Sequence, residues 1–144
     1  MNAYLNQYQS TQVDTASREQ ILIMLYDGAI RFTRQAIHAM ENGDRNGKMV
    51  GIQKAMAIIA EFRNTLDHKI GGEIAANLDA LYAFMIQSLT QANLKNDPQP
   101  LKVVDDLLSD LRATWKEAVE IARNEHINKA KVANGDYTPL KASL

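Results

Sequence analysis

The chain has 144 residues and no cysteine, and its 16 lysines and arginines against 17 acidic residues give a formal net charge of −1. A near-neutral chain does not gather nucleic acid or an anionic membrane by its overall field, and without cysteine it forms no disulfide or thiolate metal site. No stretch approaches the roughly 18 apolar residues of a membrane span, and the first residues lack the pattern of a secretory signal. We therefore expect one compact cytoplasmic domain, with no membrane insertion and no nucleic-acid binding.

The first helix is expected to follow a polar arm. Residues 1–16 lack the apolar period near 3.6 that marks most of the chain, so we expect them to lie outside the helices. Ser17 fits a helix start, because its hydroxyl can cap the first turn while Gln20 reaches back in the pattern of a capping box. The first helix is therefore predicted from about Ser17 to Glu41, where Asn42-Gly43 ends it.

Two further helices follow, with a pair of glycines between them. An apolar period of helical spacing runs from about Asn46 to Lys69, and another runs from about Glu73 to Leu94. Gly71-Gly72 separates them, and a glycine there can adopt the positive φ that closes a helix. The sequence predicts a tight reversal of the chain at this pair.

The last helix begins at a break that contains two prolines. Because proline suits only the first turn of a helix, residues 97–100 end one helix and start the next, which is predicted to reach about Asn124. Four helices of similar length with short connections pack most simply up-down-up-down. The prediction is an all-α fold: an antiparallel four-helix bundle at 17–124, an N-terminal capping arm at 1–16, and a short C-terminal helix or flexible tail at 125–144.

The apolar faces are wider than the three positions in about seven that a bundle core requires. The residues assigned to that core include Ile21, Met49, Ile70 and Ile74. Any single apolar residue outside the core register can be an ordinary flanking position or a lone exposed side chain. As a set, and with methionines that repack easily, these residues favour a surface that receives a partner. The helical residues assigned to the partner surface are Ile23, Tyr26, Ile30, Ala55, Ile58, Phe62 and Tyr82.

The N-terminal arm carries three apolar side chains in an otherwise polar segment. Tyr4, Leu5 and Tyr8 are close enough in sequence to act together as a plug. One interpretation is a fixed cap on the open end of the bundle. The other is a lid that a partner displaces, which would lower the partner's apparent affinity by the free energy of opening.

The patterns of a catalytic or metal site are missing. His38, His68 and His126 are scattered, and no Glu-x-x-His pair supplies a bundle metal site, so we expect no metal, no cofactor and no enzymatic activity. The alternative is a histidine phosphotransfer or signalling bundle that uses His68, although a histidine at a helix end more simply interacts with terminal carbonyls. Gly28 within the first helix indicates a close approach, either by a neighbouring helix or by the backbone of a partner.

Several runs of the sequence resemble one protein family. They are Ala3-Tyr4 with Tyr8, Leu22-Ile23-Met24-Leu25-Tyr26-Asp27-Gly28-Ala29-Ile30, Gly71-Gly72-Glu73-Ile74-Ala75 and Trp115. Over about residues 2–122, these runs and their order resemble the flagellin export chaperone family FliS. Phe62 departs from the leucine expected there and could reshape one pocket. The resemblance does not extend past Asn124.

The resemblance implies a cytoplasmic bacterial chaperone that works without nucleotide or metal. Such a protein binds the disordered C-terminal segment of newly made flagellin, prevents premature polymerisation, and helps deliver flagellin to the flagellar export gate. The family likeness also implies that the arm with Tyr4, Leu5 and Tyr8 caps an apolar pocket until flagellin displaces it. A displaceable arm is compatible with a monomer or with an arm-swapped homodimer.

Overall fold

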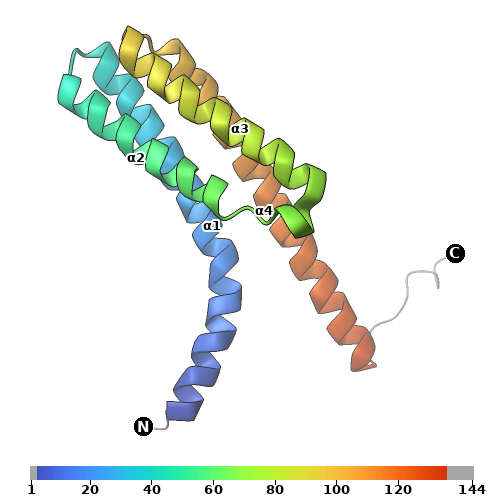
Figure 1. The fold of residues 1–144 in the computed structure, drawn as a ribbon. Helices are drawn as coiled ribbons and strands as arrows, with labels where there is room; N and C mark the ends of the chain where they lie inside the picture. Colours follow the sequence, from blue (N-terminus) through green and yellow to red (C-terminus); the bar gives the residue numbers. More distant parts are fainter. Residues whose placement is uncertain (1–2, 136–144) are drawn as a thin grey trace, which may run out of the picture. The chain divides into compact units, whose positions relative to one another are not determined.

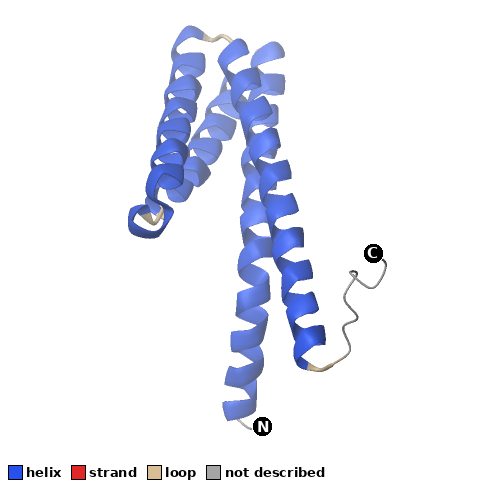
Figure 2. Cartoon of the chain, turned by 90° about the vertical axis from the view of Figure 1, so that its right-hand side faces the viewer, coloured by secondary structure: helices blue, strands red, loops and turns tan. Residues whose placement is uncertain are grey.

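The computed structural model describes the backbone of residues 3–135 and the side chains of residues 18–135. This part of the chain is helical, with short connecting loops and no strand (Figures 1 and 2). The helices are α1 (Ala3–Glu41), α2 (Arg45–Asn64), α3 (His68–Lys95) and α4 (Gln99–Ala133). The chain divides into two compact units, residues 1–112 and residues 113–144. In the first unit α1, α2, α3 and the first part of α4 pack as a four-helix bundle, which confirms the predicted fold class.

Helix α1 begins earlier than its sequence pattern predicts. Ser17 lies inside the helix, which already starts at Ala3, so the predicted start at Ser17 is wrong. The residues before Ser17 contain neither glycine nor proline, and a helix therefore meets no strong breaker there. The side chains of Tyr4, Leu5 and Tyr8 lie outside the described part of the structure, and their role as a cap stays a prediction.

The connection between α1 and α2 follows the predicted break at Asn42-Gly43. Gly43 has φ of 72°, in the left-handed region that glycine adopts without steric penalty. Asp44 then caps α2, and its Oδ1 accepts a hydrogen bond from the Gly47 N–H at 2.9 Å. The short turn brings α2 back along α1.

Helix α2 ends at Asn64, not near Lys69 as predicted. Asp67 is the reason, because its side chain accepts the backbone N–H groups of Lys69 and Ile70, both at 3.0 Å, and so starts α3 at His68. The predicted positive φ at the glycine pair is nevertheless correct, since Gly72 has φ of 51°. It kinks α3 one turn after its start and does not itself reverse the chain.

An ion pair ties the end of α2 to α3 beyond this kink. Arg63 Nε donates to Asp79 Oδ1 at 2.7 Å. This hydrogen bond lowers the pKa of Asp79 below its usual value, and the nearby positive charges of Arg63 and His68 act in the same direction. The pair is exposed, and its contribution to stability is small.

Helix α4 is longer than predicted. It starts beyond Asn96, whose φ of 52° ends α3, and Asp97 Oδ1 accepts the Gln99 N–H at 3.0 Å. The helix continues past Asn124 to Ala133, so residues 125–133 extend α4 and do not form a separate short helix. Residues 136–144, where a flexible tail was predicted, lie outside the described residues.

The buried face of α1 is rotated from the predicted core register. Ile30 is buried, and Arg34 in the same line of the helix bonds Asp105 of α4 at 3.0 and 3.1 Å. Asp27, also in this line, pairs with Arg112. This side of α1 thus faces α4, because a helix in a four-helix bundle has neighbours on two sides. Four residues assigned to the core are instead exposed: Ile21, Met49, Ile70 and Ile74. The larger side chains of the observed core are Tyr26, Ile30, Ile52, Ile59, Phe62, Tyr82, Met85, Leu89, Leu101, Val104 and Leu108.

Gly51 sets the close approach of α2 to α1. A Cβ atom at this position would lie 2.8 Å from the carbonyl oxygen of Phe32 and 3.0 Å from the Cβ and backbone nitrogen of Ala36. These neighbours are backbone or the first atom of a side chain, so they cannot turn aside.

We expect Gly51→Ala to lower the free energy of unfolding by about 1–3 kcal/mol, because the overpacking outweighs the roughly 1 kcal/mol by which alanine is the better helix former. Urea denaturation followed by circular dichroism measures this. Gln53→Ala, at an exposed position of the same helix, is the control and should change stability by less than about 0.5 kcal/mol. A neutral or stabilising Gly51→Ala would contradict the tight contact.

Candidate partner-binding surface

An open apolar groove of about 310 Å³ lies between α1 and α2. Its lining consists of Ile21, Met24, Leu25, Gly28, Arg31, Phe32 and Ile58, and we refer to it as the α1–α2 groove. Ile21 is 51% exposed and Met24 is 68% exposed, which is unusual for large apolar side chains that lie one turn apart on a helix. The groove therefore presents a continuous apolar surface that nothing in the described structure covers.

Gly28 shapes the floor of this groove. A Cβ atom on Gly28 would lie 3.4 Å from Cδ1 of Ile58, at the short end of van der Waals contact, so the α2 side chain packs directly against this part of α1. Of the two interpretations of this mid-helix glycine, the structure supports the approach of a neighbouring helix.

Two cations flank the groove. The Arg31 guanidinium carbon lies 5.0 Å from the centre of the Phe32 ring, and the Lys54 ammonium lies 5.2 Å from it. Both distances are in the range of cation–π interactions, which hold the aliphatic stems of these side chains against the aromatic ring. The groove thus has an apolar floor and a positively charged edge.

A cluster of buried aromatic side chains supports the bundle. The rings of Tyr26 and Phe62 stack with centroids 4.5 Å apart, and the Phe62 and Tyr82 rings are 5.6 Å apart. The hydroxyl groups of Tyr26 and Tyr82 form a hydrogen bond of 2.6 Å. The cluster joins α1, α2 and α3, and the phenylalanine that departs from the expected leucine is its central ring.

Removing this central ring should lower the free energy of unfolding far more than removing an exposed ring. We expect Phe62→Ala to destabilise the fold by about 3–5 kcal/mol, because it opens a cavity between two buried tyrosines. Phe84→Ala is the matched control, since Phe84 is 47% exposed and the same atoms are removed. Chemical denaturation of both variants gives the comparison, and similar losses for the two would show that the cluster is not the centre of the core.

The structure distributes the predicted partner-binding residues over two layers. Ile58 lines the α1–α2 groove and Ile23 is half-buried, so both retain accessible surface. The other five lie in the core, beneath the surface: Tyr26, Ile30, Ala55, Phe62 and Tyr82. A partner that touched these five would have to displace part of the bundle. Ile21, Leu25 and Phe32 line the groove although apolar periodicity places them in the core register of α1, whereas Met24 is one of the methionines that the sequence associates with a partner surface.

Apolar surface is also exposed away from the α1–α2 groove. Ile70 is 88% exposed and Ile74 is 69% exposed, on either side of the kink at Gly72. A second opening of about 470 Å³ is lined by residues of α3 and α4 that include Phe84 and Val103. The exposed apolar side chains are thus spread over several helices and are not gathered in one patch.

No arrangement of side chains in the described part of the chain suggests catalysis. No group of three or more histidine, aspartate or glutamate residues there could hold a metal ion, and no helix there is long and apolar enough to cross a membrane. His68 is the first residue of α3 and is exposed, so the expected interaction with carbonyl groups at a helix end is wrong. The groups left unpaired by a helix start are N–H groups, and Asp67 accepts those of Lys69 and Ile70 here.

A helical bundle with exposed apolar grooves is typical of proteins that bind another polypeptide. The family model described as "Flagellar protein FliS" matches residues 1–122, and the chain belongs to this family. It is 36% identical over 126 residues to the flagellar secretion chaperone FliS of Bacillus subtilis, covering 88% of this chain and 93% of the relative. It is 40% identical over 118 residues to that of Salmonella typhimurium, covering 81% and 87%. The corresponding chaperone of Vibrio cholerae is 38% identical over 117 residues, covering 81% and 86%.

The family establishes the general role of the chain. It is a flagellar export chaperone and not an enzyme, and it acts on a substrate of flagellar export. The alternative of a histidine phosphotransfer bundle therefore has no support from the family or from the surroundings of His68.

Proposed function

We propose that the chain is a chaperone of flagellin. It binds the disordered C-terminal segment of flagellin in the bacterial cytoplasm, prevents premature polymerisation, and assists delivery of the complex to a component of the export gate. Membership of a family of flagellar secretion chaperones supports the export role. The observation that carries the binding role is the uncovered α1–α2 groove, with Ile21 and Met24 more than half exposed.

The distribution of apolar surface favours an extended client over a compact one. A folded partner covers one contiguous patch, whereas exposed apolar side chains here occur on α1, on both sides of the α3 kink, and between α3 and α4. A disordered segment can follow such separated sites around a bundle. Because the segment loses conformational entropy when it binds, it needs several of these sites to reach useful affinity.

Release without nucleotide is consistent with the chemistry of the groove. Its walls are a methionine, aliphatic side chains and one aromatic ring, with the exposed Arg31 at the edge and no unpaired buried polar group among the described side chains. Burial of such surfaces is non-directional and does not require one fixed register. The client can therefore detach in steps, site by site.

The direct test is calorimetric titration with a peptide that comprises the C-terminal segment of the flagellin of the same organism. We expect one-to-one binding with a large negative heat-capacity change, because apolar surface is buried as the peptide orders. A scrambled peptide of the same composition is the control. Absence of binding by the native peptide would overturn the flagellin proposal.

Variants of the groove test which surface the peptide uses. We expect Ile21→Gln with Met24→Gln to weaken peptide binding by about tenfold or more, since each removes roughly 1 kcal/mol or more of apolar burial. The fold should not change, because both side chains are largely exposed. Ile121→Gln is the control, because it removes an exposed apolar side chain of α4 that belongs to none of the proposed client sites. An equal loss in Ile121→Gln would show that the groove is not the principal site.

The N-terminal arm is proposed to act as a displaceable lid through Tyr4, Leu5 and Tyr8. We expect deletion of residues 1–10 to increase the fluorescence of a dye that binds apolar surfaces, and to strengthen peptide binding by removing the free energy of opening. Substitution of the three apolar side chains by serine in the full-length chain is the matched control and should act in the same direction. Unchanged fluorescence in both would contradict the lid. The arm is compatible with a monomer or an arm-swapped homodimer, which sedimentation distinguishes.

A further inference from the structure

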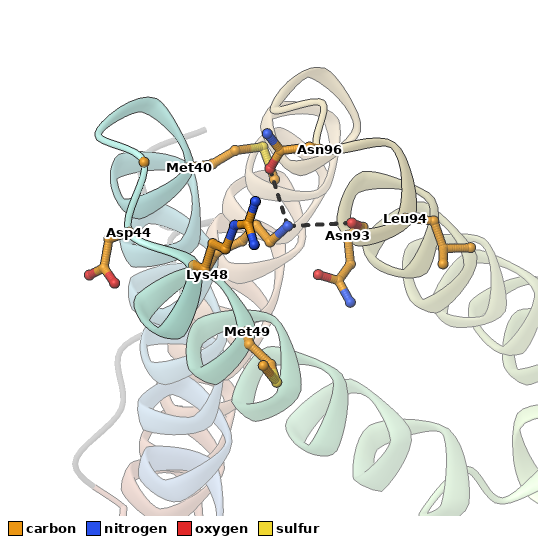
Figure 3. Close-up of a pocket in the computed structure, with 9 residues that line it drawn as sticks. Met40, Asp44, Lys48, Met49, Asn93, Leu94 and Asn96 are labelled. Atoms are coloured by element: carbon orange, nitrogen blue, oxygen red, sulfur yellow. Dashed lines mark hydrogen bonds between the residues drawn. The ribbon is translucent and has the colours of Figure 1, made fainter.

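A second groove lies at the end of the bundle, where the α1–α2 turn meets the end of α3 (Figure 3). Its volume is about 650 Å³, and we refer to it as the end groove. Met40, Met49 and Leu94 give it apolar walls, and Leu94 and Met49 are among the exposed large apolar side chains. The end groove shares no residue with the α1–α2 groove.

Among the described residues, the hydrogen-bond partners of Lys48 in the end groove are neutral groups. Its ammonium donates to Oδ1 of Asn96 at 3.1 Å and to the carbonyl oxygen of Asn93 at 3.4 Å, as Figure 3 shows. An ammonium group has three N–H donors, so one remains available. Neither acceptor carries a charge, and the positive charge of Lys48 is therefore fixed in place without being neutralised.

Arg45 adds a second cation on the same side of α2. It lies three residues before Lys48, a spacing that makes two helical side chains neighbours, and it forms no ion pair with any described residue. The one carboxylate of the lining, Asp44, accepts the Gly47 N–H and points away from Lys48 (Figure 3). The end groove thus contains two adjacent cations, neither of which forms an ion pair with a described residue.

This placement is unfavourable for the isolated chain. Two like charges three residues apart repel each other, and cations in the first turns of a helix oppose its dipole. The N-cap Asp44 places one carboxylate at this end of α2, and the first turn that follows has no acidic residue, so two cations stand against one carboxylate. Locally unfavourable residues of this kind are expected where a protein receives a ligand of opposite charge.

We propose that the end groove binds the free carboxyl end of the client polypeptide. This inference rests on the proposed function, because only a C-terminal segment brings an α-carboxylate together with nearby side chains. The carboxylate accepts hydrogen bonds from the remaining N–H of Lys48 and from Arg45, which are charge-assisted and stronger than those between neutral groups. An apolar side chain next to the chain end lies against Met49 and Leu94. The end groove then fixes where the client ends on the bundle.

The test compares two forms of the flagellin C-terminal peptide that differ only at the last group, a free carboxylate or a carboxamide. Calorimetric titration against the full-length chain should show about tenfold weaker binding of the amide, because it loses a charge-assisted pair of hydrogen bonds. In Arg45→Gln and in Lys48→Gln the difference between acid and amide should fall below about threefold. Lys69→Gln, an exposed lysine outside the end groove, removes the same charge and should leave the difference intact.

The outcomes separate this inference from the proposed function. If neither peptide binds the wild-type chain, the proposed function itself is overturned. If both bind equally tightly, the flagellin proposal stands and the end groove does not hold a chain end. An acid preference that persists in both Arg45→Gln and Lys48→Gln would place the carboxylate elsewhere, and it too would overturn the inference. Arg45→Gln keeps this test valid even if Lys48→Gln perturbs the end of α3, since Arg45 is exposed and unpaired among the described residues.

Discussion

The packing of α1 against α2 depends on small residues at the contact line. Gly51 lets α2 approach the backbone of α1 at Phe32 and Ala36, and Gly28 accepts Ile58 farther along the same interface. Because both contacts follow one antiparallel register, they fix how α2 lies along α1. The same register stacks Phe62 on Tyr26 and opens the α1–α2 groove on the outer side. The core and the candidate partner surface are therefore two consequences of one helix pair.

The fold class followed from helical periodicity, whereas several helix ends did not. Gly43 and the positive φ of Gly72 could be predicted, because glycine in a left-handed conformation has a direct sequence signal. The end of α2 at Asn64 depends on capping by Asp67, a local competition that apolar periodicity does not reveal. Apolar periodicity also did not reveal the early start of α1. A polar segment without glycine or proline can be helical although it has no apolar period to indicate a helix.

The sequence indicated that the bundle has an excess of apolar surface, but it indicated only some of the residues that form the candidate site. An excess of apolar residues was visible in the sequence, but periodicity does not state which neighbour each face meets. Ile30 seemed surplus and is buried beside the α1–α4 ion pairs, while Ile21 seemed internal and is half exposed. The end groove was not predictable, because it combines the turn after α1 with the end of α3. Its one sequence signal is the pair of cations in the first turns of α2.

The methionines in the described part of the chain are unequally protected. Met24 in the α1–α2 groove is mostly exposed, whereas Met85 in the core is fully buried. Oxidation by peroxide turns an apolar thioether into a polar sulfoxide and follows accessibility. Mild oxidation therefore modifies the groove before it modifies the core. A partly oxidised preparation would keep its helical content and its melting temperature after the groove has lost its apolar character.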